Sequence, residues 1–132
     1  MVFYRPIKDI DELKNLFTDK QFDKNRIYGG YITEGAGEYF GKILVEIDGY
    51  RSKIIDIETN GDSLMVEGLI RAALTYAGNR NAYTASCTAE EFDGVLTLLG
   101  FVKTDGVYTG EIPELLQGTC CKADKFDISD KK

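Results

Sequence analysis

The side chains that could carry acid–base chemistry in this 132-residue chain are mainly carboxylates, because the chain contains no histidine. Without histidine, Ser-His-Asp and Cys-His catalytic arrangements are excluded. Proton transfer then falls to Asp, Glu, Tyr, Cys or water held by the backbone. Four carboxylates alternate along two candidate strands: Glu46, Asp48, Asp56 and Glu58. Such alternation is typical of the solvated side of a half-buried sheet.

Phosphate binding is a second chemistry that the sequence suggests, at the unit running from Lys53 to Gly78. Its β-branched start predicts a strand, and the polar turn Asn60–Ser63 ends in two good N-cap residues. Apolar residues then recur at helical spacing up to Gly78. A helix that follows a strand in this way directs free N–H groups and its positive dipole end at the turn. That geometry can hold a phosphate, although ordinary strand–helix units share it.

The thiols do not indicate a disulfide framework or a metal site. Cysteine occurs three times, an odd number, and Cys120 and Cys121 are adjacent. Without histidine, zinc would need carboxylates and scattered thiols, so we predict no metal. Cys87, at the end of a candidate strand, is interpreted as a small core residue.

Composition and charge restrict the partners and the location of the protein. The net charge of −6 and the sequence pI near 4.7 leave no basic stripe for a nucleic-acid backbone. No apolar run approaches the roughly 20 residues that span a membrane. The first residues also lack the pattern of a signal peptide. These features predict a cytoplasmic protein with no nucleic-acid or membrane partner.

Further strands and helices surround the strand–turn–helix unit. Apolar alternation and turn residues predict strands over residues 2–5, 28–33, 39–47, 51–58, 82–87, 101–104 and 107–112. Pro6 should close the first strand. Two dipeptides, Asp48-Gly49 and Asp105-Gly106, are two-residue hairpin signals.

Helices are expected at three places along the chain, and a helical turn at a fourth. Asp9 with Glu12, and Thr88 with Glu91, form capping-box pairs at the starts of two of the helices. The long helix lies between them, and Pro113 can open a final helical turn. Tight turns join the strands from 28 to 58, which predicts an antiparallel meander. A helical crossover should place residues 82–87 parallel to residues 52–58.

This order of elements resembles that of the GNAT acetyltransferase superfamily, with the chain as a divergent member. Residues 69–77 (LIRAALTYA) are similar to the family's long helix, and residues 98–101 (LLGF) to the end of its last helix. The resemblance covers residues 1–112 and implies an α+β fold. It further implies a mixed twisted sheet with an antiparallel meander, a long helix, a parallel central pair, a C-terminal hairpin and helices on both faces. We therefore predict a GNAT-like domain over residues 1–118 and a charged tail over residues 119–132.

The resemblance also implies a site. In the family, acetyl-CoA enters a split between the fourth and fifth strands, and its pyrophosphate lies on amides of the loop that opens the long helix. That loop corresponds here to six residues: Gly61, Asp62, Ser63, Leu64, Met65 and Val66. A carboxylate on the central strands can act as general base in the family, and Glu58 is the candidate. The family's tyrosine acid corresponds to Leu96, so Tyr108 is the candidate replacement.

The loop departs from the family pattern. Gly61 replaces an arginine or glutamine, and Leu64 and Val66 replace small residues that allow close backbone approach. Asp62 adds a negative charge where phosphates are expected. The leading hypothesis is an acetyl-CoA-dependent N-acetyltransferase acting on a small amine, with a homodimer as a further candidate partner. The alternative is a GNAT-like binding module without catalysis, and a third hypothesis is a redox-responsive protein using Cys120 and Cys121.

Overall fold

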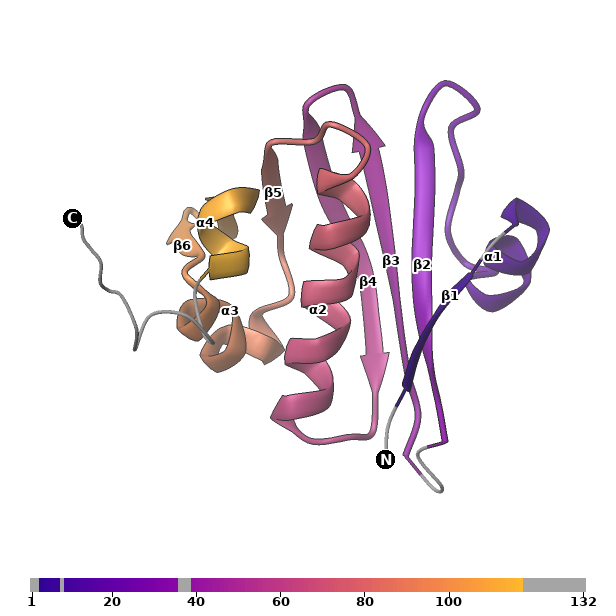
Figure 1. The fold of residues 1–132 in the computed structure, drawn as a ribbon, viewed down its shortest axis with the longest axis horizontal. Helices are drawn as coiled ribbons and strands as arrows, with labels where there is room; N and C mark the ends of the chain where they lie inside the picture. The colour runs from indigo at the N-terminus through magenta and orange to yellow at the C-terminus, as the bar shows by residue number, and fades with distance from the viewer. Residues whose placement is uncertain (1–2, 8, 36–38, 118–132) are drawn as a thin grey trace.

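The sheet that organises the molecule contains seven strands in the order β1-β2-β3-β4-β5-β7-β6 (Figure 1). The structure is a computed structural model that describes residues 3–7, 9–35 and 39–117. The predicted tail, Cys120 and Cys121 lie outside the described residues. The first four strands pair antiparallel, and they are β1 (Phe3–Ile7), β2 (Ile27–Glu34), β3 (Gly41–Asp48) and β4 (Arg51–Thr59). The predicted meander is therefore confirmed.

The second half of the sheet also follows the prediction. β5 (Thr84–Cys87) lies parallel to β4, and β7 (Val107–Glu111) pairs antiparallel with β5. β6 (Val102–Thr104) forms the edge beside β7. Asp105 and Gly106 connect these last two strands with φ values of 53° and 82°, as a hairpin turn of this type requires.

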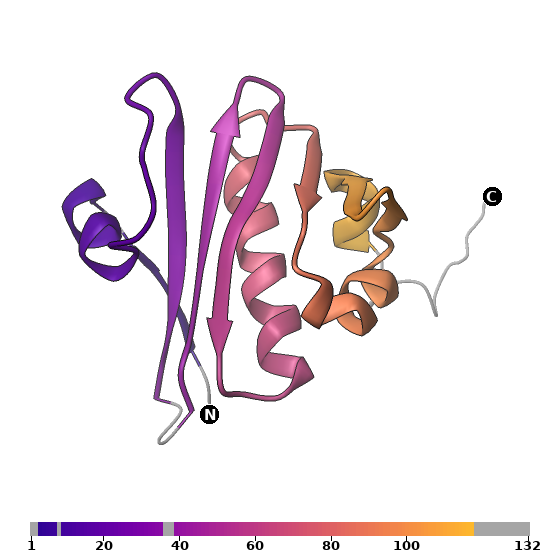
Figure 2. The same ribbon diagram turned by 180° about the vertical axis from the view of Figure 1, so that it is seen from behind.

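Helices cover both faces of the sheet, as predicted. α1 (Ile10–Leu16) packs on one face around Leu13, Phe17 and Leu44. On the other face lie α2 (Ser63–Gly78), α3 (Asp93–Leu99) and α4 (Ile112–Gln117), and Figure 2 shows α2 behind the strands from the reverse side. A short 3₁₀ helix, η1 (Glu90–Phe92), precedes α3. The main core lies between α2 and the sheet.

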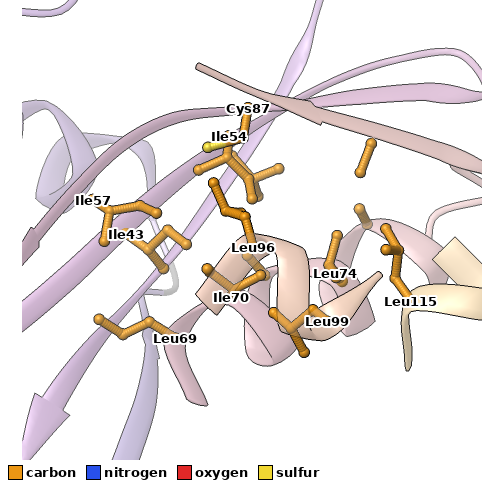
Figure 3. Packing of buried hydrophobic residues seen from close by; sticks show 14 of the residues in the cluster. Ile43, Ile54, Ile57, Leu69, Ile70, Leu74, Cys87, Leu96, Leu99 and Leu115 are labelled. Atoms are coloured by element: carbon orange, nitrogen blue, oxygen red, sulfur yellow. The ribbon is translucent and has the colours of Figure 1, made fainter. Parts of the chain in front are cut away.

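The main core is built on one face of α2, the longest helix. The buried residues of α2 form one face of the helix, with adjacent pairs that recur every four positions, and they are Met65, Val66, Leu69, Ile70, Ala73, Leu74 and Ala77. Figure 3 shows Leu69 and Ile70 facing Ile43 and Ile57 of the sheet. Leu96 and Leu99 from α3 and Leu115 from α4 join the same cluster.

Three local predictions were wrong. β1 continues through Pro6, which is tolerated because β1 is an edge strand. Asp48 pairs with Arg51, so the two-residue turn is Gly49–Tyr50, with Gly49 at φ 65°. The box of Thr88 with Glu91 does not form, because α3 begins after η1 without a side-chain cap. Asp9, in contrast, accepts the Glu12 amide at 2.7 Å as predicted.

Candidate active site

The main feature of the candidate site is the place where two parallel strands separate. β4 and β5 pair over only four positions, from Arg51 with Thr84 to Ile54 with Cys87. β4 then continues to Thr59, whereas β5 ends, and Figure 2 shows β5 stopping part-way along β4. Among the described residues, none pairs with this second half of β4 on the β5 side. One edge of a central strand is therefore open.

A β-bulge marks the point of separation. Leu44 pairs with Asp56 and Val45 pairs with Ile54, so Ile55 is an extra residue in β4. A bulge bends its strand and increases the local twist. The bulge follows directly after Ile54, the last residue of β4 that pairs with β5. The bend therefore contributes to the separation of the two strands.

The opened strands enclose a pocket of about 210 Å³. β4 contributes residues 54–57 to its wall, and the opposite wall consists of Cys87, Thr88, Ala89 and Glu91. Burial raises the pKa of the Cys87 thiol, which keeps it neutral and poorly nucleophilic. The pocket is thus a narrow cleft between an open strand edge and the segment that follows β5.

Asp56 is the acidic residue of β4 that lies at this pocket. Burial is the main cause that raises its pKa, and a hydrogen bond with Glu58 raises it further, while the nearby Lys20 opposes both. A carboxylate with a raised pKa beside a pocket is a candidate for proton transfer. The alternation of carboxylates predicted Asp56 on the solvated side of the sheet, but this residue is half-buried and belongs to the lining of the pocket. The break in alternation at Ile55 was the signal that the interpretation overlooked.

Glu58, the residue predicted as general base, lies one position further along the same face. Its side chain is 50% exposed and does not line the pocket. Its Oε1 lies 3.6 Å from Nζ of Lys42 on the facing strand. The Lys42 ammonium also donates to the Leu16 carbonyl and lies over the Phe17 ring. Glu58 therefore interacts with both Lys42 and Asp56.

Tyr108, the residue predicted as general acid, is fully buried on β7 beside Cys87. Its hydroxyl donates to Oδ1 of Asp93, the first residue of α3, at 2.5 Å. That hydrogen bond is the main cause that raises the pKa of Tyr108. The structure does not bring Tyr108 into the lining of the pocket, and its hydroxyl holds α3 to the sheet.

The predicted cofactor loop leads into α2, which begins at Ser63, but none of its six residues lines the pocket between the strands. Asp62 is the N-cap, and its side chain accepts the Met65 amide at 3.2 Å. Met65 and Val66 are buried in the core, and Leu64 is 72% exposed. The bulky residues of the loop therefore leave the split open. Asp62, Leu64 and Met65 border a separate pocket of about 250 Å³ with Tyr4 and Tyr39.

The two ends of acetyl-CoA differ in how well they fit the open edge of β4 and the start of α2. The open edge of β4 suits an extended arm with amide groups, because unpaired N–H and C=O groups can pair with it as with a strand. The start of α2 does not suit a diphosphate, because the Asp62 carboxylate already occupies the helix N-terminus and accepts the Met65 amide. The split fits the acyl end of the molecule, and the loop opposes the diphosphate.

The described part of the chain contains neither a metal-binding cluster nor a membrane-spanning helix. No three Cys, Asp or Glu side chains among the described residues come together in a way that could hold a metal ion. No helix within residues 3–7, 9–35 and 39–117 has the length and apolar character needed to cross a membrane.

The strand order, the separated parallel pair and the helix between β4 and β5 define the GNAT fold, and the chain has this fold. Its structure is similar to the crystal structure of the ribosomal-protein-S18-alanine N-acetyltransferase from Escherichia coli, with a TM-score of 0.60. The match covers 85% of this chain and 94% of that chain at 11% sequence identity. No family model and no curated protein matches the sequence.

Proposed function

We propose that the protein transfers an acetyl group from acetyl-CoA to the amine of a small molecule. The observation that carries this proposal is the pocket between β4 and β5, where the parallel pairing ends after four positions. The ribosomal-protein-S18-alanine N-acetyltransferase from E. coli has the same fold. When bound, acetyl-CoA would supply an activated thioester carbonyl. The amine nitrogen would bond to the carbonyl carbon, the C–S bond would break, and CoA would leave as its thiol with the proton that the amine gives up.

The residues of this chain would supply binding and proton transfer. The open edge of β4 would hold the pantetheine amides, with Cys87, Thr88 and Ala89 on the other side. Asp56 would accept the proton that the amine loses during its attack, because this residue belongs to the lining of the pocket and burial raises the pKa of its carboxyl group. The net charge of −6 favours the approach of a cationic amine.

Blocking the pocket should weaken acetyl-CoA binding. Thr88 is exposed in the pocket wall, so Thr88→Trp places a large ring in the cleft without disturbing the core. We expect the affinity for acetyl-CoA to fall at least about tenfold, since a ligand of this kind depends on close packing. Titration calorimetry is the measurement.

The matched control is Thr109→Trp on β7, where the threonine is also exposed but does not line the pocket. This variant should bind acetyl-CoA like the unaltered protein. If the unaltered protein and Thr109→Trp both fail to bind at millimolar acetyl-CoA, the acetyltransferase proposal is wrong. Equal binding by all three proteins would place the cofactor elsewhere.

The second candidate function is a GNAT-like binding module without catalysis. The Asp62 cap favours it, because this carboxylate opposes a diphosphate at the helix start. A module of this kind would bind a small molecule in the pocket but show no acetyl transfer to any amine offered. Acetyl transfer assays on a set of small amines therefore separate the two functions.

Replacing Asp62 with asparagine should strengthen CoA binding. Asn caps a helix about as well as Asp, so α2 should remain intact. Removing one charge near the helix N-terminus is worth about 0.3–1 kcal/mol, which corresponds to an affinity about two to five times higher. S-acetyl-pantetheine lacks the diphosphate, so its affinity should be the same for both proteins. A weaker CoA affinity in Asp62→Asn would show that Asp62 contacts another part of the ligand.

A further inference from the structure

A third pocket, of about 310 Å³, lies at the opposite end of α2 from the Asp62 cap. Six residues from β1, β2 and the end of α2 line it, and they are Pro6, Ile7, Tyr31, Tyr76, Asn79 and Arg80. The 16 residues of α2 separate it from the helix start, a distance of about 24 Å at 1.5 Å per residue. It shares no lining residue with the pocket between β4 and β5.

The cation of this pocket, Arg80, has no carboxylate partner in the described part of the chain. Its guanidinium lies 3.6 Å from the centre of the Tyr76 ring, and its Nη1 donates to the Tyr76 carbonyl at 3.3 Å. Three other arginines each pair with a carboxylate, and they are Arg5, Arg26 and Arg71. Arg51 also lies over a tyrosine ring and hydrogen-bonds to the Tyr50 hydroxyl, but it lines none of the three pockets described above. Most of the five N–H donors of Arg80 remain available.

The aromatic wall that holds Arg80 is fixed by its own contacts. The Tyr76 hydroxyl donates to the Tyr28 carbonyl at 3.0 Å. The Tyr31 ring stands nearly perpendicular to the Tyr76 ring, at 86° with 6.5 Å between centres. Gly29 makes room for this arrangement, because a Cβ there would lie 2.1 Å from the Tyr76 ring. The guanidinium is therefore oriented before any ligand arrives.

We infer that this pocket binds a small molecule in which a carboxylate or phosphate group is attached to a flat apolar group. A guanidinium forms two parallel hydrogen bonds with either anion. The Asn79 amide is a further donor at the same wall. The rings of Tyr31 and Tyr76 and the side chain of Pro6 offer apolar surface to a planar group. The inference is independent of the proposed acetyl transfer, because it concerns different residues.

The competing explanation is that Arg80 only stabilises the end of α2. A cation near a helix C-terminus interacts favourably with the last carbonyl groups, and Arg80 donates to one of them. This role requires the charge alone and neither the pocket nor a ligand. A binding experiment separates the two explanations.

The test is a titration of the ¹⁵N-labelled full chain with sodium benzoate, phenyl phosphate and benzamide at constant ionic strength. Benzamide has nearly the shape of benzoate but no charge. We expect the signals of the Arg80 side chain and the Asn79 amide to shift with both anions, with dissociation constants in the millimolar range for ligands this small. Benzamide should bind at least about tenfold more weakly, because it cannot form charge-assisted bonds. The two anions distinguish a carboxylate ligand from a phosphate ligand.

The variant that tests the cation is Arg80→Gln, which should bind benzoate and phenyl phosphate at least about tenfold more weakly. Arg51→Gln is the matched control, because Arg51 also lies over a tyrosine ring, at 5.4 Å from the centre of Tyr50. It should bind like the unaltered protein. Arg80→Lys keeps the charge but loses the planar fork, so its binding should be intermediate.

Three results would overturn the inference. The first is an absence of shifts around the pocket at about 50 mM of either anion, a concentration at which such small ligands should bind. The second is equal binding of benzamide and benzoate, and the third is unchanged anion binding in Arg80→Gln. The amide spectrum of each variant shows whether it is folded, so a loss of binding is interpreted only for a folded protein.

Discussion

Replacing Asp56 with asparagine should lower the turnover of acetyl transfer by about 10²–10⁴-fold, the usual contribution of a positioned general base. Asparagine has nearly the shape of aspartate but cannot accept a proton from the attacking amine. The affinity for acetyl-CoA should change less than about threefold, since the open edge of β4 stays intact. Steady-state kinetics with an accepted amine and calorimetry with acetyl-CoA measure the two quantities.

Although Asp56→Asn should lower turnover, it should raise the stability of the fold at neutral pH. Burial and the hydrogen bond with Glu58 raise the pKa of Asp56, so the folded protein favours its protonated form. Its contribution to stability is then present at low pH and is lost as the pH rises through the raised pKa. The asparagine side chain carries no charge at any pH, so Asp56→Asn should be more stable than the unaltered protein at pH 7. This advantage should disappear below about pH 3.9, the ordinary pKa of aspartate, in urea unfolding at both pH values.

The matched control for Asp56 is Glu58→Gln. The Glu58 side chain is 50% exposed and lies 3.6 Å from Lys42, outside the pocket lining. We expect this change to lower turnover less than about tenfold, because it removes only a neighbour of the base. If Glu58→Gln abolishes turnover and Asp56→Asn does not, Glu58 is the base, as the sequence comparison with the family predicted.

Local sequence signals predicted the elements whose geometry depends on nearby residues. The turn at Asp105 and Gly106 needs two positive φ values, and Asp-Gly is well suited to provide them. The cap of α2 needs a short polar side chain before an apolar period, and Asp62 supplies it. These signals lie within a few residues of the turn and the cap that they produce. Both structures can therefore be predicted from the sequence without knowledge of the overall fold.

The features of the candidate site depend on contacts between distant parts of the chain. The bulge at Ile55 exists only in relation to β3, and the open edge of β4 exists only because β5 ends after Cys87. η1 begins where the Glu90 amide donates to the Thr88 carbonyl at 3.0 Å, which replaces the predicted side-chain cap. For this reason the sequence directed attention to Glu58, whereas the burial of Asp56 and its place in the pocket lining became visible only in the folded structure.

A second large effect is expected for the core, where Leu69→Ala should lower the free energy of unfolding by about 2–5 kcal/mol. Leu69 is fully buried between α2 and the sheet (Figure 3). The matched control is Leu64→Ala in the same helix, where the leucine is 72% exposed. Its stability should change by less than about 0.5 kcal/mol, because Ala and Leu have similar helix propensities and little burial is lost. Urea unfolding of both variants is the measurement.

Leu69→Ala should leave a cavity in the core, and Gly41 on β3 lies next to it. A double variant of these two residues therefore tests the cost of the cavity. A Cβ at Gly41 would lie 3.0 Å from Cδ1 of Leu69, so Gly41→Ala should destabilise the unaltered protein. In the Leu69→Ala background that methyl group enters the space that the leucine leaves. Gly41→Ala should then be less destabilising than in the unaltered protein, with a coupling of about 0.5–3 kcal/mol. If the effects of Gly41→Ala and Leu69→Ala on stability are additive, another side chain has filled the cavity first. Met65 is the candidate, because its sulfur also lies 3.0 Å from the Cβ position at Gly41.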